Sequence, residues 1–355
     1  MFLRNIWQVA AFAQELERPM LARQIIDEPV LLFRTEDGIY AIEDLCPHRL
    51  VPLSAGRREG NQIVCGYHGL RFGGDGKCTA MPGKVGAIPS SARVRTYPIV
   101  ERWDLVWIWM GDPTLADPAL LPNLHWLADP DWKSVNGMVH VDADYRLIND
   151  NLLDLSHETY VHSSSISNGE SGEEIATFPL TITTDGRVLW AERQMDDIVA
   201  PPGLAAAMEI GDRVDRTQRA VYMAPALNLT EGIMRSRQPG SNAIASHRIL
   251  HLLTPETSST THYFFIVSRD YKLDNEPLDA VTRDLGFAAF AEDKAMIECQ
   301  QRSLARRPGA HVPKVAWGID EAPVRGRRML ETQIATESKD PAALAAPTEL
   351  IRGAA

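Results

Sequence analysis

The chain has 355 residues, 45% of them hydrophobic and 23% charged, with a formal net charge of −11. This length and composition predict about two ordinary globular domains. The acidic balance argues against a nucleic acid or an anionic membrane surface as a partner. No apolar run reaches the ~18 residues that a helix needs to span a bilayer, so no membrane partner is expected.

The first residues, MFLRNIWQVAAFAQELERP, have too short an apolar core for a secretion signal. Without such a signal we expect a reducing cytoplasm and no disulfides. The role of each cysteine must then be judged from its local context. The four cysteines are Cys46, Cys65, Cys78 and Cys299.

Residues 1–110 show the pattern of a small all-β domain. The segments PVLLFR and IYAIE flank Asp37-Gly38, which is a favoured hairpin turn. Further short apolar segments follow between turns, among them QIVC, VRTYPIV and LVWIWM. The Pro- and Asp-rich segment at 111–122 predicts a junction between domains.

Residues 111–340 mix helical and strand patterns, so the fold class is α+β. A helix is expected from about Tyr145 to Tyr160, and the segments LTITT, RVLWAER and THYFFIVS are typical of strands. A long helix is expected near the end, where Val281, Leu285, Ala288 and Ala289 recur at helical spacing. We expect the tail at 341–355 to be loosely held.

Two short motifs carry cysteine and histidine together. Cys46-Pro-His48 is followed by sixteen residues and then by Cys65-Gly-Tyr-His68. Such a set could hold structural zinc, but zinc fingers usually group the two cysteines in one half and the two histidines in the other. The order Cys-His then Cys-His suits a [2Fe–2S] cluster of the Rieske type, in which one iron takes two cysteines and the other two histidines.

A second histidine pair lies in DNLLDLSHETYVH, where His157 and His162 miss the HExxH spacing of zinc proteases by one residue. On a straight helix, positions i and i+5 point about 140° apart. Both imidazoles can therefore meet one ion only if the helix ends or distorts between them, which Thr159 and Val161 favour. Two structural histidines are the alternative. Glu158, which would be the base of a protease, is then an ordinary helix residue.

A non-haem Fe(II) site for oxygen chemistry needs two histidines and one carboxylate, with other positions left open. The later segment FAEDKAMIE offers Glu292 and Asp293. Periodicity alone does not choose between these two carboxylates.

Over nearly its whole length the chain resembles the Rieske non-haem iron oxygenases. The motifs that carry this resemblance are CPHR with CGYHG, then DLVWIWMGDP, then DNLLDLSHETYVH. RNIWQVA and LLTPET followed by HYFF resemble the vanillate O-demethylase and dicamba monooxygenase group. The resemblance implies a Rieske domain at 1–110. It also implies a START/Bet v 1-like catalytic domain at 111–340, with an antiparallel sheet and helices.

The resemblance also implies roles for individual residues. The [2Fe–2S] cluster would be bound by Cys46, His48, Cys65 and His68, and the mononuclear Fe(II) by His157, His162 and Asp293. Asp154, on the helix face of His157, would bridge this iron ligand to His68 of a neighbouring subunit. Such a bridge implies a homotrimer, in which the [2Fe–2S] cluster of one subunit lies close to the mononuclear iron of the next. Asn151 could lie near the iron or simply on the helix surface.

The implied activity is that of the terminal oxygenase of a multicomponent monooxygenase. It would use O2 and electrons from NAD(P)H, delivered by a separate reductase or ferredoxin, because the chain has no GxGxxG of its own. The expected substrate is a small methoxylated aromatic acid, which is O-demethylated with release of formaldehyde. The alternatives are a ring or side-chain hydroxylase and a non-catalytic Rieske electron carrier.

The substrate side is the least specified part of the sequence. Asn228, His251 and Phe287 lie in segments that could line a pocket, although each is as ordinary in a core or on a surface. His251 could orient a carboxylate or phenol. The polar segment 163–177 could be an access loop. An acidic electron-transfer protein could dock on basic residues beside the cluster loops, namely Arg49, Arg57, Arg58, Arg71 and Lys77.

Overall fold

A computed structural model describes residues 2–83, 86–162, 177–307, 315, 317–343 and 349–351. The chain divides into two compact units. Of the described residues, the first unit contains those up to Leu121, together with Thr254–Ser258 and residues 336–343. In the described part, no helix is long and apolar enough to cross a membrane.

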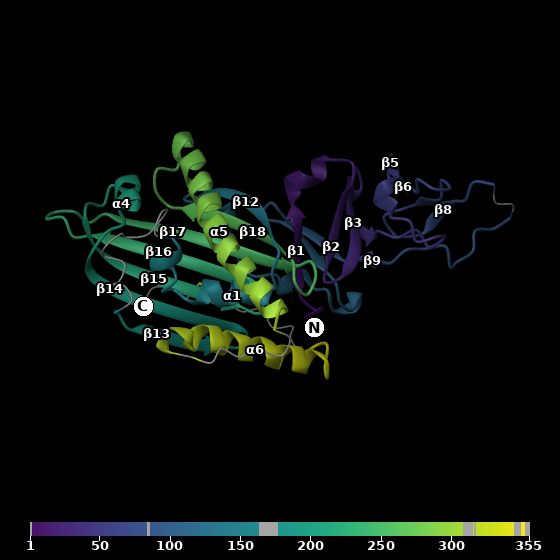
Figure 1. Cartoon of the computed structure of the whole chain (residues 1–355). Coiled ribbons are helices and arrows are strands. Elements are labelled where there is room, and N and C mark those ends of the chain that lie inside the picture. The colour runs from purple at the N-terminus through teal and green to yellow at the C-terminus, as the bar shows by residue number, and fades with distance from the viewer. Residues whose placement is uncertain are drawn as a thin grey trace. The chain divides into compact units, whose positions relative to one another are not determined.

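The first unit is built from three small antiparallel sheets, as the sequence predicts (Figure 1). Their strand orders are β1-β11-β10, β2-β3-β4-β9 and β5-β6-β7-β8. The strands are β1 (Trp7–Phe12), β2 (Leu21–Ile25), β3 (Glu28–Thr35), β4 (Gly38–Glu43), β5 (Arg57–Glu59), β6 (Gln62–Val64), β7 (Arg71–Phe72), β8 (Cys78–Ala80), β9 (Thr96–Tyr97), β10 (Ile99–Arg102) and β11 (Leu105–Trp109).

Strand β3 organises the core of this unit because both of its faces are buried. Val30 and Leu32 point into one apolar cluster, while Leu31 and Phe33 point into the other. The second cluster also contains the two cysteines of the paired motifs, so their loops are anchored in a packed core.

The boundary of the first unit differs from the expected one. The chain divides after Leu121, at the far end of the Pro-rich junction, and two later segments return to the first unit. Hydrogen bonds explain this return: Thr254 Oγ1 donates to the Val9 carbonyl at 2.6 Å, and the Glu337 carboxylate accepts from the Asn5 amide at 2.6 Å. Such long-range contacts leave no local pattern in a sequence.

The second unit is a seven-stranded antiparallel sheet with helices on one face, in the order β12-β18-β17-β16-β15-β14-β13 (Figure 1). The strands are β12 (Lys133–Val141), β13 (Leu180–Asp185), β14 (Val188–Val199), β15 (Arg213–Met223), β16 (Leu227–Ser236), β17 (Ile244–Pro255) and β18 (Thr261–Arg269). The helices are α1 (Tyr145–Leu153), α2 (Glu158–Val161), α4 (Pro202–Met208), α5 (Glu276–Ala305) and α6 (Glu321–Glu337). Short 3-10 turns also occur in both units. Those of the first unit are Ala13–Glu17, Leu53–Ala55, Pro113–Leu115 and Pro118–Leu120, and those of the second are His125–Ala128 and Gly318–Asp320.

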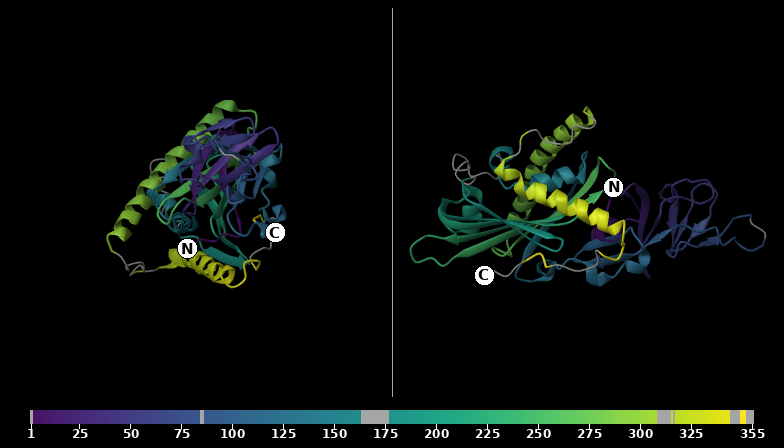
Figure 2. Two further views of the ribbon diagram at one scale, coloured as in Figure 1. Left: turned by 90° about the vertical axis from the view of Figure 1, so that its right-hand side faces the viewer. Right: turned by 90° about the horizontal axis from the view of Figure 1, so that it is seen from below.

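Helices α5 and α6 lie on the same face of the sheet (Figure 2), and each contacts strands directly: α5 packs on β18 through Phe290 and Phe265, and α6 packs on β15. Side chains alternate between the two faces along a strand. On β15 the even-numbered residues face these helices, as Gln218 and Tyr222 show. A Cβ at Gly326 of α6 would lie 2.7 Å from Leu153 and 3.5 Å from Tyr222, so this glycine permits close packing of α6 on α1 and β15.

The opposite face of the sheet carries a ladder of charges. Glu192, Arg219, Glu231 and Arg248 are direct cross-strand neighbours on β14 to β17. Successive members are paired at 2.6, 2.6 and 2.9 Å, and Arg248 lies 4.2 Å from the ring centre of Trp132. These pairs favour one strand register.

Two expectations about local structure are corrected. The helix expected from Tyr145 to Tyr160 ends at Leu153, and α2 is a separate turn that starts at Glu158. Asp154 caps α1 with φ −89° and ψ 89°, which takes the chain out of the helix. The tail is not loosely held throughout, because Leu350 is buried and its carbonyl accepts from Trp190 Nε1 at 2.9 Å.

Candidate metal centres and active site

The two Cys-His motifs form a matched pair of loops that follow β4 and β6. In each loop the cysteine carbonyl accepts from the amide four residues later, Leu50 in one and Gly69 in the other, at 2.8 and 3.0 Å. In each loop the cysteine amide also donates to the carbonyl five residues later. Both Leu50 and Gly69 have positive φ, 57° and 73°, so the two loops share the same unusual turn.

These loops present two buried thiols and two exposed imidazoles. Cys46 and Cys65 are each 2% exposed and form no disulfide. The rings of His48 and His68 lie 4.6 Å apart, edge to face. Burial raises the pKa of the Cys46 thiol, and the neighbouring Cys65 thiol raises it further. The thiol pair and the imidazole pair are therefore each brought together as the Rieske arrangement requires.

A single zinc ion does not fit these four residues. A zinc site needs several donor atoms close together. Among the described residues, three possible ligands with donor atoms all within 4.8 Å of one another are found at His157, His162 and Asp293. The donors of the two cluster loops do not converge in this way. A set spread over two irons fits them better than a tetrahedral site around one ion.

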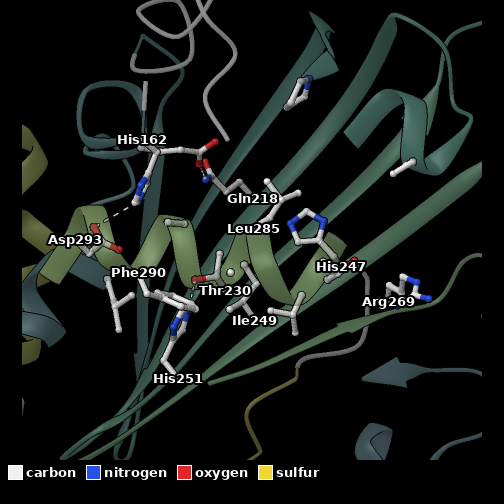
Figure 3. Close-up of a pocket in the computed structure, with 18 of the residues that line it drawn as sticks. His162, Gln218, Thr230, His247, Ile249, His251, Arg269, Leu285, Phe290 and Asp293 are labelled. Carbon is white, nitrogen blue, oxygen red and sulfur yellow. Dashed lines mark hydrogen bonds and ion pairs between the residues drawn. The ribbon is translucent and has the colours of Figure 1, made fainter. Parts of the chain in front are cut away.

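His157, His162 and Asp293 form the second candidate metal centre. The two imidazoles precede and follow the single turn of α2, and their ring centres lie 5.1 Å apart. Asp293 Oδ1, from α5, lies 3.5 Å from His157 Nε2 and 3.4 Å from His162 Nε2. Figure 3 shows the contact between Asp293 and His162. Two imidazoles and one carboxylate on one side of an ion are the donor set of non-haem Fe(II) oxygenases.

The other ring nitrogens of both histidines are also fixed. His162 Nδ1 lies 2.9 Å from Glu292 Oε2, and His157 Nδ1 contacts the backbone carbonyl of Asp154. Metal-bound histidines usually donate this second N–H to a carboxylate or a carbonyl, which fixes the tautomer and the ring orientation. Glu292, which periodicity alone did not separate from Asp293, therefore supplies this supporting carboxylate.

Asp154 is placed differently from the sequence expectation. It lies outside α1 and α2, so it does not share a helix face with His157. Its carboxylate Oδ1 accepts from the Ser156 amide at 3.0 Å and from the Ser156 hydroxyl. Asn151 does lie at the centre, where its Nδ2 donates to Asp293 Oδ1 at 3.1 Å.

The electrostatics of this centre suit a cation. Burial lowers the pKa of His162, but hydrogen bonds to Asp293 and Glu292 outweigh it and raise the pKa to about 8. Burial raises the pKa of Asp293, yet His162, His157 and Asn151 hold it below its usual value. Asp293 is therefore ionised at neutral pH, and the site fits a divalent ion.

We expect Glu292→Gln to weaken iron binding at this centre by ~10–100-fold, because His162 loses its charged hydrogen-bond partner. The affinity can be measured by competition with a chromogenic Fe(II) chelator. Glu276→Gln, at an exposed position on the same helix, is the matched control and should bind iron normally. Equal affinity of both variants and the native chain would show that Glu292 does not orient His162.

A cavity of about 260 Å³ extends from His157, His162 and Asp293, between α5 and the helix-facing side of the sheet (Figure 3). Its α5 wall is apolar apart from Thr282 and Asp293, and its sheet wall is largely polar. The α5 wall includes Leu278, Val281, Leu285, Ala289 and Phe290, and the sheet wall includes Arg216, Gln218, Thr230, His247, Ile249, His251 and Arg269.

Of the three residues expected at the substrate, His251 lines this cavity and the other two do not. Asn228 is buried and donates to Asn149 Oδ1 at 2.7 Å. Phe287 is 38% exposed and packs edge to face on Phe265, because its position on α5 lies off the lining stripe.

Sequence reasoning missed several residues of this site. Leu285, Ala289 and Asp293 lie four residues apart on α5, so the stripe that lines the cavity leads directly to Asp293 and not to Glu292. Glu158 is not an ordinary helix residue, because its Oε2 accepts from Gln218 Nε2 at 2.6 Å and its Oε1 lies 3.4 Å from Arg216. Residues 163–176 of the expected access loop lie outside the described residues.

Comparison with known proteins agrees with both centres. Residues 6–98 match the family model of the Rieske [2Fe-2S] domain, and residues 141–336 match that of the vanillate O-demethylase oxygenase C-terminal domain. The chain is therefore a Rieske non-haem iron oxygenase, an oxidoreductase with a [2Fe–2S] cluster and a mononuclear iron. Within this class it belongs to the vanillate O-demethylase oxygenase family.

Individual relatives match over almost the whole chain. A vanillate O-demethylase oxygenase subunit from a Pseudomonas species is 36% identical and covers 96% of this chain and 97% of its own length. The oxygenase component of dicamba O-demethylase from Stenotrophomonas maltophilia is 35% identical, over 93% of this chain and 97% of its own. A crystal structure of dicamba monooxygenase bound to 3,6-dichlorosalicylic acid superimposes with a TM-score of 0.88 at 34% identity, covering 95% of this chain and 99% of the other.

Proposed function

We propose that this protein is the terminal oxygenase of a multicomponent monooxygenase that O-demethylates a methoxylated aromatic acid. The observation that carries the proposal is the cavity, which has His157, His162 and Asp293 at one end and an apolar wall from α5 along its length. Its volume of about 260 Å³ suits a compound with one aromatic ring. Relatives named vanillate and dicamba O-demethylases support the same reaction.

We further propose the roles of the residues. His157, His162 and Asp293 would hold the iron, with Glu292, Asn151 and the Asp154 carbonyl fixing their orientation. When bound, the iron would supply activation of O2, with electrons from the cluster held by Cys46, His48, Cys65 and His68.

The reaction consumes O2, two electrons and two protons. One oxygen atom enters a C–H bond of the substrate methyl group and the other leaves as water. The resulting hemiacetal separates into a phenol and formaldehyde. The chain's part is to hold the ring so that the methyl group faces His157, His162 and Asp293. Ala289 and Phe290 of the apolar wall exclude water from that end.

An external reductase or ferredoxin is part of this proposal, in a cytoplasmic setting where the free cysteines stay reduced. The basic residues expected to dock it are largely neutralised in this structure. Arg57 and Arg71 both pair with Glu59, and Lys77 pairs with Asp75. The surface beside the cluster imidazoles is instead partly apolar, with Leu50 67% exposed and Tyr67 55% exposed.

We also propose that the chain works as a homotrimer in which Asp154 of one subunit faces His68 of the next. Asp154 supports this role because it lies three residues before His157 and already contacts its ring through the backbone carbonyl. Sedimentation should then give three times the chain mass of 39.4 kDa. A monomer with full reductase-driven activity would contradict the trimer.

The test of the proposed function is a screen of methoxylated aromatic acids with a generic reductase and NADH. A substrate should give formaldehyde and the matching phenol in amounts close to the NADH consumed. A relative named toluene-4-sulfonate monooxygenase, 34% identical over 349 residues, favours hydroxylation without demethylation as the second candidate. An oxygenated product that keeps its methoxy group would support that alternative, and NADH use without any product would support neither.

A further inference from the structure

One cross-strand row on the helix-facing side of the sheet is unusually polar. Arg193, Gln218, Gly232 and His247 are direct neighbours across β14, β15, β16 and β17. Paired residues of this kind project their side chains from the same face of a sheet. A Cβ at Gly232 would lie 2.2 Å from the His247 ring, so the imidazole rests over this glycine within the row.

Arg269 extends the row onto β18. The Ser246 amide donates to Asp270 Oδ1 at 2.7 Å, and the Asp270 amide donates to the Ser246 carbonyl at 3.3 Å. Because β17 and β18 are neighbours in the sheet, this pairing places Arg269 beside His247. Figure 3 shows His247 and Arg269 at the end of the cavity opposite to His162 and Asp293.

Every polar side chain in this row keeps a buried atom without a hydrogen-bond partner. In the described residues these atoms include Nε and Nη1 of Arg193, Oε1 of Gln218, Nδ1 of His247 and Nη1 of Arg269. Arg216 Nε, on the same face of β15, is also unpaired, and Arg216 is only 4% exposed. Unpaired buried donors are costly to a fold, which points to a ligand that satisfies them.

The unpaired groups are mainly N–H donors and cations. Glu158 lies 3.4 Å from Arg216, at the limit of a hydrogen bond, and does not saturate that guanidinium. Arg269 pairs with Asp279 through Nη2, which leaves its Nη1 free. A ligand group that fits this end must therefore bring acceptors, and an anionic oxygen-bearing group brings the most.

The metal end of the cavity offers no such donors from His251. Its Nδ1 lies 2.6 Å from the Tyr263 hydroxyl, and its Nε2 lies 3.2 Å from Thr230 Oγ1. Burial lowers the pKa of His251 to about 3 and that of His247 to about 4, so both rings are neutral. His251 thus differs from His247 in this structure because both of its ring nitrogens already contact protein groups, whereas His247 Nδ1 is unpaired.

We propose that the row of Gln218, His247 and Arg269, together with Arg216, binds the carboxylate or sulfonate of an aromatic substrate. This inference rests on the proposed function and names the orientation of its substrate. His247 and His251 are four residues apart on β17, which separates the two ends by roughly 13 Å. The acid group and the oxidised methyl group must then lie at opposite ends of the substrate, so para-substituted acids fit and ortho-substituted acids do not.

The test measures equilibrium binding to the oxidised, cofactor-loaded protein, where no turnover occurs. The probes are 4-methoxybenzoate, 4-methoxybenzenesulfonate, 2-methoxybenzoate and the neutral 4-methoxybenzyl alcohol. We expect the better of the two para acids to bind about tenfold or more tightly than either the alcohol or the ortho acid. Which para acid binds more tightly identifies the preferred anion.

Three variants locate the effect. Arg216→Gln should weaken binding of the para acids by about tenfold or more and leave the alcohol unchanged. His247→Leu should act in the same direction, and it serves as the second variant if Arg216→Gln does not fold. Arg219→Gln removes an arginine from the other face of the same strand and should leave every dissociation constant unchanged.

Equal binding of the para acids and the alcohol by the native protein would overturn the inference. So would variants of Arg216 and His247 that weaken acids and alcohol alike. Failure of the proposed function looks different: the para acids would bind tightly and respond to both variants, yet no formaldehyde would form when reductase and NADH are added.

Discussion

Replacement of Asp293 by alanine is expected to remove the mononuclear iron and leave the [2Fe–2S] cluster intact. Asp293 supplies the only carboxylate of the group and lies 3.5 Å or less from both imidazoles. Iron should fall from about three to about two atoms per chain, with labile sulfide steady at about two. Reductase-driven product formation should fall by ~10³-fold or more.

The control for Asp293→Ala is Asp284→Ala, an exposed position on the same helix, which should keep all of its iron. Elemental analysis and a sulfide assay on the same samples separate the two metal sites. Retention of the third iron by Asp293→Ala, with normal product formation, would place the oxygen chemistry elsewhere.

The second large effect is expected from Cys46→Ser in the cluster loops. The Cys46 thiol is buried beside Cys65, and a serine hydroxyl is a poor iron ligand. Labile sulfide should fall from about two to near zero per chain, while the mononuclear iron remains. Turnover driven by the reductase should stop, because electrons no longer reach the second centre.

Cys78→Ser is a matched control because Cys78 is buried in the same apolar cluster and lies outside both cluster loops. Its thiol donates to the Ala80 carbonyl at 3.3 Å, a role that a serine hydroxyl can take over. The visible spectrum of the cluster should persist in Cys78→Ser. Loss of sulfide in both variants would indicate general unfolding of the first unit, and loss in neither would reject Cys46 as a ligand.

The cluster loops were accessible to sequence reasoning because their chemistry is local. Each loop places its cysteine and histidine two or three residues apart, and the shared turn at Leu50 and Gly69 follows from the same short stretch. His157 and His162 are also close in sequence. The helix end expected between them is found at Val161, where the single turn of α2 stops and His162 leaves the helical conformation. The break before His157 was missed, because it depends on Asp154 capping α1.

The polar end of the cavity could not be predicted from local patterns. Gln218, His247 and Arg269 come from three strands, and each looks like an ordinary polar residue in its own segment. Their common position depends on the register of β15 to β18, which the sequence leaves open. Phe287 shows the opposite error, in which a residue expected at the substrate does not reach it. It lies on α5 like Asp293, yet it packs on Phe265 and does not line the cavity.

The most direct test of the proposed demethylation uses 4-methoxybenzoate whose methyl group carries three deuterium atoms. With the holoenzyme, a reductase and NADH, we expect about one dideuterated formaldehyde and one 4-hydroxybenzoate for each NADH consumed. Trapped formaldehyde and phenol can be quantified together by mass spectrometry. An oxidised product that keeps all three deuterium atoms, or NADH and O2 consumption without labelled formaldehyde from any methoxylated acid in the screen, would contradict it.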